Sequence, residues 1–134
     1  MGKTNFHRNF FKREGVIFLC LLFCFFPFTS NAITIYSVAA GNWSSAATWD
    51  CGCVPGAGDD VFIDFNVTLD GAYTCNTLNF ENTIGPGNGV LTFNTGASLT
   101  VTNDLTMGID NDPSTLNVNA GTLTVEGIVI GTPG

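Results

Sequence analysis

Beyond position 14 the only charged side chains that could do chemistry are carboxylates, because no Lys, Arg or His follows that position. Two close pairs exist, Asp59 with Asp60 and Asp110 with Asp112, and a pair of carboxylates is what a glycosidase uses as its acid and base. Adjacent aspartates in a strand point to opposite faces, and turn aspartates commonly hydrogen-bond the local backbone. Since cationic groups and histidine bases are missing, we expect that this chain is not an enzyme.

The short segment Asp110-Asn111-Asp112 is the better candidate for chemistry, as a weak calcium site. Its side chains supply closely spaced oxygen atoms, the ligands that this hard cation prefers. The full ligand set of a calcium-binding hand is absent, so a solvated turn is the alternative. Apart from calcium, the sequence predicts no cofactor.

Three cysteines follow the N-terminal segment: Cys51, Cys53 and Cys75. In an oxidising compartment two of the three are expected to form a disulfide. Stacked repeats would also bring Cys75 near Cys51 or Cys53. A structural zinc normally takes four ligands, and no histidine is at hand to complete such a set, so zinc is less favoured than a disulfide.

Residues 1–32 have the layout of a signal peptide. Basic residues precede the apolar run Val16–Phe28, which is shorter than the roughly 20 residues that span a membrane. Ser30 and Ala32 place small residues at positions −3 and −1 of a cleavage site. We expect cleavage after Ala32, no stable membrane span afterwards, and a product that is secreted or held at the outer cell surface. An uncleaved membrane anchor is the alternative.

The charge of the chain is strongly divided. Its formal net charge is −7, yet all four basic residues and only one of the 11 acidic residues lie within the first 14 positions. The rest of the chain therefore carries ten acidic and no basic side chains. Because such a surface repels phosphate backbones, we expect no nucleic-acid partner.

After Ala32 the sequence consists of short runs of β-branched and aromatic residues separated by Gly, Asn, Asp and Pro, which predicts strands and turns. No window carries apolar residues at helical spacing over three turns. The expected strands are 33–38, 60–65, 67–70, 77–80, 90–94, 98–102, 104–107, 115–119, 122–125 and 128–130.

These strands recur in sets of three. One set begins at Leu91, Leu99 and Leu105, and the next set begins 25, 24 and 23 residues later, at Leu116, Leu123 and Ile128. An earlier and looser set is expected at 61–64, 67–69 and 78–80. The inward side chains should be Leu91, Phe93, Leu99, Val101, Leu105 and Met107, followed in the next repeat by Leu116, Val118, Leu123, Val125, Ile128 and Ile130.

A repeat of about 24 residues with three short strands predicts an all-β fold, a right-handed parallel β-helix or β-solenoid. We expect the solenoid over residues 61–134, in about three turns. A small β-sandwich, which also uses short alternating strands, is the alternative.

Residues 33–60 are expected to form an N-terminal cap. Trp43 and Trp49 are large apolar side chains suited to covering the open end of the first turn. The last residues fall at a corner of the repeat, so we expect the chain to be the N-terminal part of a longer protein or the product of a truncated reading frame. An uncovered end also makes end-to-end self-association a predicted interaction.

One stretch is specific enough to compare with a known family. The segments 41–49 (GNWSSAATW), 54–63 (VPGAGDDVFI) and 67–70 (VTLD) resemble the opening of secreted surface proteins of Bacteroidetes-type bacteria, and the related eight-glycine domain. The resemblance covers roughly residues 35–130. It implies a β-helical module of a long adhesin, or of a protein acting on extracellular polysaccharide, and it brings no catalytic motif.

These observations leave three functions open. The first is a structural and adhesive β-solenoid module of an exported protein, with an extracellular glycan or another surface ligand as partner. The second is the non-catalytic N-terminal part of a polysaccharide-active enzyme. The third is a carbohydrate-binding module by itself, or an ice-binding one, because threonine pairs such as Thr100 with Thr102 and Thr122 with Thr124 could form a flat polar face.

Overall fold

The computed structural model describes residues 31–80, 88–108 and 113–131, and these form short strands with one 3-10 turn. The predicted signal peptide therefore lies almost wholly outside the described residues. Within the described ranges, no helix is long and apolar enough to cross a membrane.

The elements follow the chain in this order: β1 (Thr34–Tyr36), β2 (Gly41–Asn42), the 3-10 helix η2 (Ala46–Thr48), β3 (Asp60–Phe62), β4 (Asn66–Leu69), β5 (Ala72–Cys75), β6 (Thr77–Phe80), β7 (Val90–Phe93), β8 (Ser98–Val101), β9 (Leu105–Met107), β10 (Thr115–Asn117), β11 (Thr122–Val125) and β12 (Val129–Gly131).

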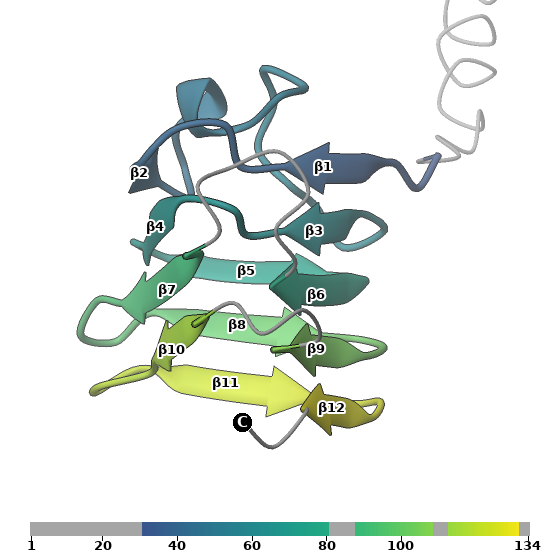
Figure 1. Cartoon of the computed structure of the whole chain (residues 1–134), viewed down its shortest axis with the longest axis vertical. Coiled ribbons are helices and arrows are strands. Elements are labelled where there is room, and N and C mark those ends of the chain that lie inside the picture. The colour runs from purple at the N-terminus through teal and green to yellow at the C-terminus, as the bar shows by residue number, and fades with distance from the viewer. Residues whose placement is uncertain (1–30, 81–87, 109–112, 132–134) are drawn as a thin grey trace, which may run out of the picture. The chain divides into compact units, whose positions relative to one another are not determined.

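The strands stack into three parallel sheets (Figure 1). The five-stranded sheet has the order β1-β3-β6-β9-β12, the four-stranded sheet the order β10-β7-β4-β2, and the three-stranded sheet the order β11-β8-β5. The chain visits the sheets in turn, so β4-β5-β6, β7-β8-β9 and β10-β11-β12 are three complete rungs. This architecture confirms the predicted β-solenoid of about three turns. The β-sandwich alternative is wrong, because every pairing between named strands is parallel.

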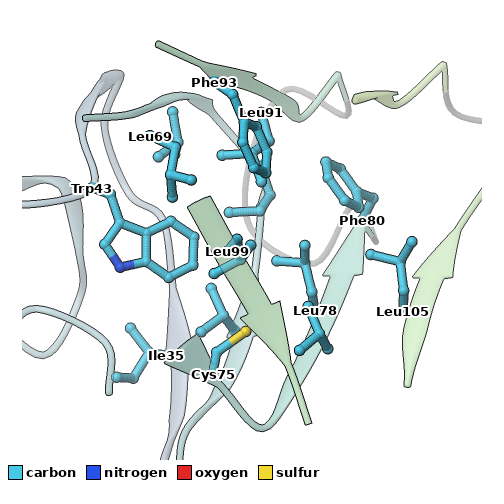
Figure 2. Close-up of a cluster of buried hydrophobic side chains, with 14 of the residues drawn as sticks. Ile35, Trp43, Leu69, Cys75, Leu78, Phe80, Leu91, Phe93, Leu99 and Leu105 are labelled. Carbon is cyan, nitrogen blue, oxygen red and sulfur yellow. The ribbon is translucent and has the colours of Figure 1, made fainter. Parts of the chain in front are cut away.

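Each rung buries one face of its strands against the rungs on either side. The side chains alternate with a period of two, so Leu91 and Phe93 of β7 are buried while Thr92 between them is only half-buried. Figure 2 shows the resulting core, where aliphatic and aromatic side chains from all three sheets meet around Leu99. Corners are made by residues that tolerate positive φ, such as Gly96 (φ 78°) and Asn119 (φ 47°).

Two of the three predicted offsets between rungs agree with the register. Leu91 pairs with Leu116, and Leu99 with Leu123. The third offset is wrong by one residue, because Leu105 pairs with Val129 and not with Ile128.

The cause lies at the corners. Three residues separate β8 from β9 and three separate β11 from β12, so Val129 falls directly on Leu105. A shift of one residue moves each side chain to the other face of the strand. Ile130 therefore stands in register with Thr106, and Ile128 lies in the corner, both exposed. The prediction that Ile128 and Ile130 point into the core is thus wrong.

The earliest predicted set also needs correction. Strand β3 pairs with β6, so Val61 and Leu78 occupy the same sheet in successive layers and not two sides of one rung. The middle strand of the first complete rung is β5 (Ala72–Cys75), which the sequence pattern does not predict. Gly71 and Ala72 are typical of a turn, yet Tyr73 and Cys75 alternate inward as a strand requires.

Candidate functional site

The outer face of the three-stranded sheet carries a regular array of hydroxyl groups. Its register places Thr74, Thr100 and Thr124 in one column and Ala72, Ser98 and Thr122 in the next. We call these six residues the hydroxyl face. Their neighbours along each strand point inward, as the buried Leu99 and Val101 of β8 show. The face therefore lies opposite the core, across the back of the stack in Figure 1.

The spacing of this array follows from the backbone. Neighbouring strands lie about 4.8 Å apart, and alternate residues of one parallel strand are about 6.6 Å apart. Each hydroxyl group is one donor and two acceptors. Within the described part of the chain, no hydrogen bond occupies the hydroxyl groups of Thr74, Ser98, Thr100, Thr122 or Thr124. These groups are available to a ligand.

The hydroxyl face carries no charged side chain, in contrast to the acidic sequence as a whole. The five-stranded sheet differs, since Asp60 lies on its outer surface and accepts hydrogen bonds from Asn76 and Thr77 at 2.8 and 2.9 Å. Only part of the hydroxyl face was visible in the sequence. Thr74 was missed together with β5, and Thr102 falls beyond β8, where its hydroxyl donates to the Cys75 carbonyl oxygen.

The two tryptophans lie together at the N-terminal end of the core. Trp43 and Trp49 are both buried, and their rings meet edge to face with centroids 5.0 Å apart. The Trp49 Nε1 donates to the Trp43 carbonyl oxygen at 2.9 Å, whereas the Trp43 Nε1 is buried without a partner among the described residues. Trp43 also stacks on Tyr73 of the first complete rung, with centroids 5.7 Å apart. Figure 2 shows Trp43 at the edge of the core, beside Leu69 and Ile35.

Asp70 links the segment that carries Trp43 to the first complete rung. Its carboxylate accepts hydrogen bonds from the Ser44 backbone N–H at 3.2 Å, from the Ser44 hydroxyl at 2.5 Å and from the Tyr73 hydroxyl at 3.2 Å. Partial burial raises the pKa of Asp70, but the hydrogen bonds from Ser44 and Tyr73 outweigh it, so the net shift of this pKa is downward. Burial and the Asp70 charge raise the pKa of Tyr73. We regard this cluster as a structural link.

The cysteines divide into a pair and a single thiol. Cys51 and Cys53 form a disulfide across Gly52, whose φ is +61°. Cys75 is free and buried in the core, so stacking does not bring it to either of the others. Burial, together with the charges of Asp60 and Asp59, raises the pKa of Cys75 to about 12. Its thiol is thus a core side chain and not a nucleophile.

The residues predicted to bind calcium, Asp110 and Asp112, lie outside the described residues. Across 31–80, 88–108 and 113–131, no group of three or more His, Cys, Asp or Glu side chains could hold a metal ion. Asp59 and Asp60 do not act as a pair. Asp59 accepts from the Gly56 N–H at 2.8 Å within its own turn, and Asp60 binds side chains of the next layer.

Comparison of the chain with protein-family models, with curated proteins and with solved structures finds no match.

Proposed function

We propose that this chain is an exported structural and adhesive β-solenoid module that binds a neutral extracellular polysaccharide through its hydroxyl face and performs no catalysis of its own. The observation that carries this proposal is the register of Thr74, Thr100 and Thr124, which repeats one hydrogen-bonding group at each rung. A polysaccharide repeats its own hydroxyl groups along one direction. Two repeating surfaces can form several weak contacts at once, and these add up in affinity.

Charge favours a neutral ligand over an acidic one. With ten acidic and no basic side chains after position 14, the module would repel uronic-acid or phosphate polymers. The hydroxyl face itself has no charge, so its contacts with a sugar would be ordinary hydrogen bonds, each contributing about 0.5–1.5 kcal/mol.

Export supports an extracellular role. The predicted signal peptide over residues 1–32 and the resemblance of segments 41–49 and 54–63 to bacterial surface proteins both favour a location outside the cell. In that setting the Cys51–Cys53 disulfide would be stable.

The alternative is that the chain forms the non-catalytic N-terminal part of a polysaccharide-active enzyme. The two functions share the same ligand class, so binding alone does not separate them. The reading frame downstream of Gly134 does: further repeats ending in a sorting domain favour the adhesive module, and a catalytic domain favours the enzyme.

A second candidate function is ice binding, which the same face supports by a different argument. A flat sheet that repeats threonine hydroxyl and methyl groups in two directions presents a regular surface. The spacing of these groups could match the lattice of ordered water. Thermal hysteresis of the purified protein tests this function, and its absence would exclude it.

The proposed function is tested with an array of neutral and acidic polysaccharides, read at low and high salt. We expect binding to at least one neutral polymer, with an affinity that does not change with salt. Binding confined to acidic polymers, or no binding to any polymer, would contradict the proposal.

A further inference from the structure

The Cys51–Cys53 disulfide lies in the connection between η2 and β3, and it bridges a single residue, Gly52. Cys51 is exposed to solvent, whereas Cys53 is partly buried against the core. In the chain-entropy account, a disulfide stabilises a fold by constraining the unfolded chain, and the effect is smallest for the shortest loops. A crosslink of this kind does little to hold distant parts of the chain together.

Other contacts hold the turn that carries this disulfide. The Asp50 backbone N–H donates to the Tyr36 carbonyl oxygen at 3.0 Å, and the Tyr36 N–H donates to the Asp50 carboxylate at 3.1 Å. The Gly52 N–H donates to the carbonyl oxygen of the buried Trp49 at 3.1 Å. None of these hydrogen bonds uses a sulfur atom. We therefore expect the turn to keep its place when the disulfide is opened.

The exposed sulfur also has a hydrogen-bond donor beside it. The Cys53 backbone N–H donates to the Cys51 Sγ at 3.1 Å. A donor at this position stabilises a negative charge on the Cys51 sulfur. Exposed disulfides are the ones most open to exchange with external thiols, so the Cys51 sulfur is both accessible and able to leave as a thiolate.

The charge around the disulfide selects among thiols. The chain after position 14 has ten acidic and no basic side chains. One of them, Asp50, is exposed directly before Cys51, and its carboxylate is held there by the Tyr36 N–H. An attacking thiolate already carries one negative charge. A thiol with an acidic group of its own brings a second charge and is repelled more strongly.

We propose that the Cys51–Cys53 disulfide is a thiol–disulfide exchange site that reacts with thiols lacking an acidic group, and not a structural crosslink. In the oxidising setting of an exported protein, the disulfide is the resting form. The site is separate from the hydroxyl face and does not depend on glycan binding.

The exchange takes place in two steps. A thiolate attacks the exposed Cys51 Sγ, the S–S bond breaks, and its electron pair leaves on the Cys53 sulfur, which takes a proton from water. A second thiolate then attacks the outer sulfur of the mixed disulfide. The Cys51 sulfur leaves with the electron pair, accepts the hydrogen bond of the Cys53 N–H and is protonated. Two external thiols are thus oxidised to a disulfide, and the two cysteines are reduced.

The test uses the chain that an exporting host releases, folded and at pH 8. It is incubated with cysteamine, 2-mercaptoethanol or 2-mercaptoethanesulfonate, quenched with acid, alkylated and weighed by mass spectrometry. Cleavage at aspartates locates the labels. We expect a mixed disulfide with one added thiol and then alkylation of Cys51 and Cys53, with the buried Cys75 unlabelled. The reduced chain should melt within about 4 °C of the oxidised one.

Two variants test the role of charge, with rates compared at equal thiolate concentration. Asp50→Asn keeps an oxygen acceptor for the Tyr36 N–H and should speed the reaction of the anionic 2-mercaptoethanesulfonate at least about twofold, an effect that shrinks at high salt. The reaction of the cationic cysteamine should not become faster. Glu126→Gln removes an exposed carboxylate on the last rung and should leave both rates unchanged.

Several results would overturn the proposal. A disulfide that resists all three thiols until the chain is unfolded in urea would be a structural crosslink. The same conclusion would follow if reduction abolished the cooperative melting transition. Equal rates for the anionic and the cationic thiol, or equal effects of Asp50→Asn and Glu126→Gln, would show that the acidic surroundings do not select the thiol.

Discussion

Asp70 links the segment that carries Trp43 to the first complete rung, and its carboxylate accepts three hydrogen bonds there. Its pKa is lower in the folded chain than its ordinary value of 3.8. A lowered folded pKa means that the ionised form stabilises the fold. This contribution is complete above the ordinary pKa and is lost as the pH falls through the lower folded pKa.

We therefore expect Asp70→Asn to lower the free energy of unfolding by about 1–2 kcal/mol at neutral pH. The difference from the parent should be smaller at pH 3 than at neutral pH, because pH 3 lies below the ordinary pKa of 3.8 and this contribution is then being lost. Urea unfolding at the two pH values measures both effects. Glu126→Gln, which changes an exposed carboxylate, is the control and should change stability by less than about 0.5 kcal/mol. Equal stability of Asp70→Asn and the parent at neutral pH would show that the link contributes nothing.

Cys75 provides a second test at the residue scale. Because this thiol is buried and burial raises its pKa to about 12, a thiol reagent at pH 8 should leave the folded protein unlabelled. In denaturant the signal-cleaved chain should titrate one thiol, since Cys51 and Cys53 are paired. Rapid labelling of the folded protein would mean that the core around β5 is open.

Residue types alone were enough to predict most of the core side chains of the second complete rung. Leu91, Phe93, Leu99 and Val101 are buried as their alternation indicates. The pairing of the cysteines could not be predicted in this way, because it depends on which corner faces which, and the spacing of Cys51, Cys53 and Cys75 fits more than one arrangement.

At the scale of elements, the corners decide the register of the strands. One corner column runs through Asp59, Asn76, Asn103 and Gly127. The backbone N–H groups of the last three donate to the carbonyl oxygen of the preceding residue in the column, at 2.8, 2.8 and 3.1 Å. The last position of this column has no room for a side chain. A Cβ on Gly127 would lie 2.5 Å from the Asn103 carbonyl oxygen and 2.6 Å from its carbon.

We expect Gly127→Ala to destabilise the fold by about 1–3 kcal/mol, because the corner must shift to relieve the overlap. The matched control is Gly131→Ala, whose Cβ would meet nothing within 4 Å and whose effect should be below about 1 kcal/mol. Thermal or urea unfolding of the two variants gives the comparison. If both cost the same, the described register of β9 with β12 is not the one the protein adopts.

Corners also explain which elements the sequence pattern located and which it missed. Strands β6 and β11 have the predicted bounds, since clear alternation and turn residues mark both ends. Strand β5 was missed because its first residues are small and follow Gly71, and the register of β12 was misjudged because Ile128 is as apolar as Val129. The number of residues in each corner cannot be predicted from local hydrophobicity. It becomes apparent only when two rungs are stacked in register.

At the scale of the whole molecule, the repeat of about 24 residues was sufficient to predict the solenoid, because stacked rungs are the way such short strands bury their inward faces. The hydroxyl face was harder to predict. It exists only where β5, β8 and β11 lie in register, and two of its residues, Ala72 and Thr74, belong to the strand that the pattern left out.

The central claim is that this face binds a neutral polysaccharide, and the most direct test removes its hydroxyl groups without changing shape. The triple variant Thr74→Val, Thr100→Val and Thr124→Val keeps β-branched residues that suit a strand. The control is Thr68→Val with Thr92→Val, a pair of threonines in register on the four-stranded sheet.

The measurement is the affinity for the neutral polysaccharide that the parent chain binds, by isothermal titration calorimetry. Loss of several hydrogen bonds at about 0.5–1.5 kcal/mol each predicts that the triple variant binds at least about tenfold more weakly, while the control binds as the parent does. Unchanged affinity of the triple variant, or an equal loss in the control, would contradict the account.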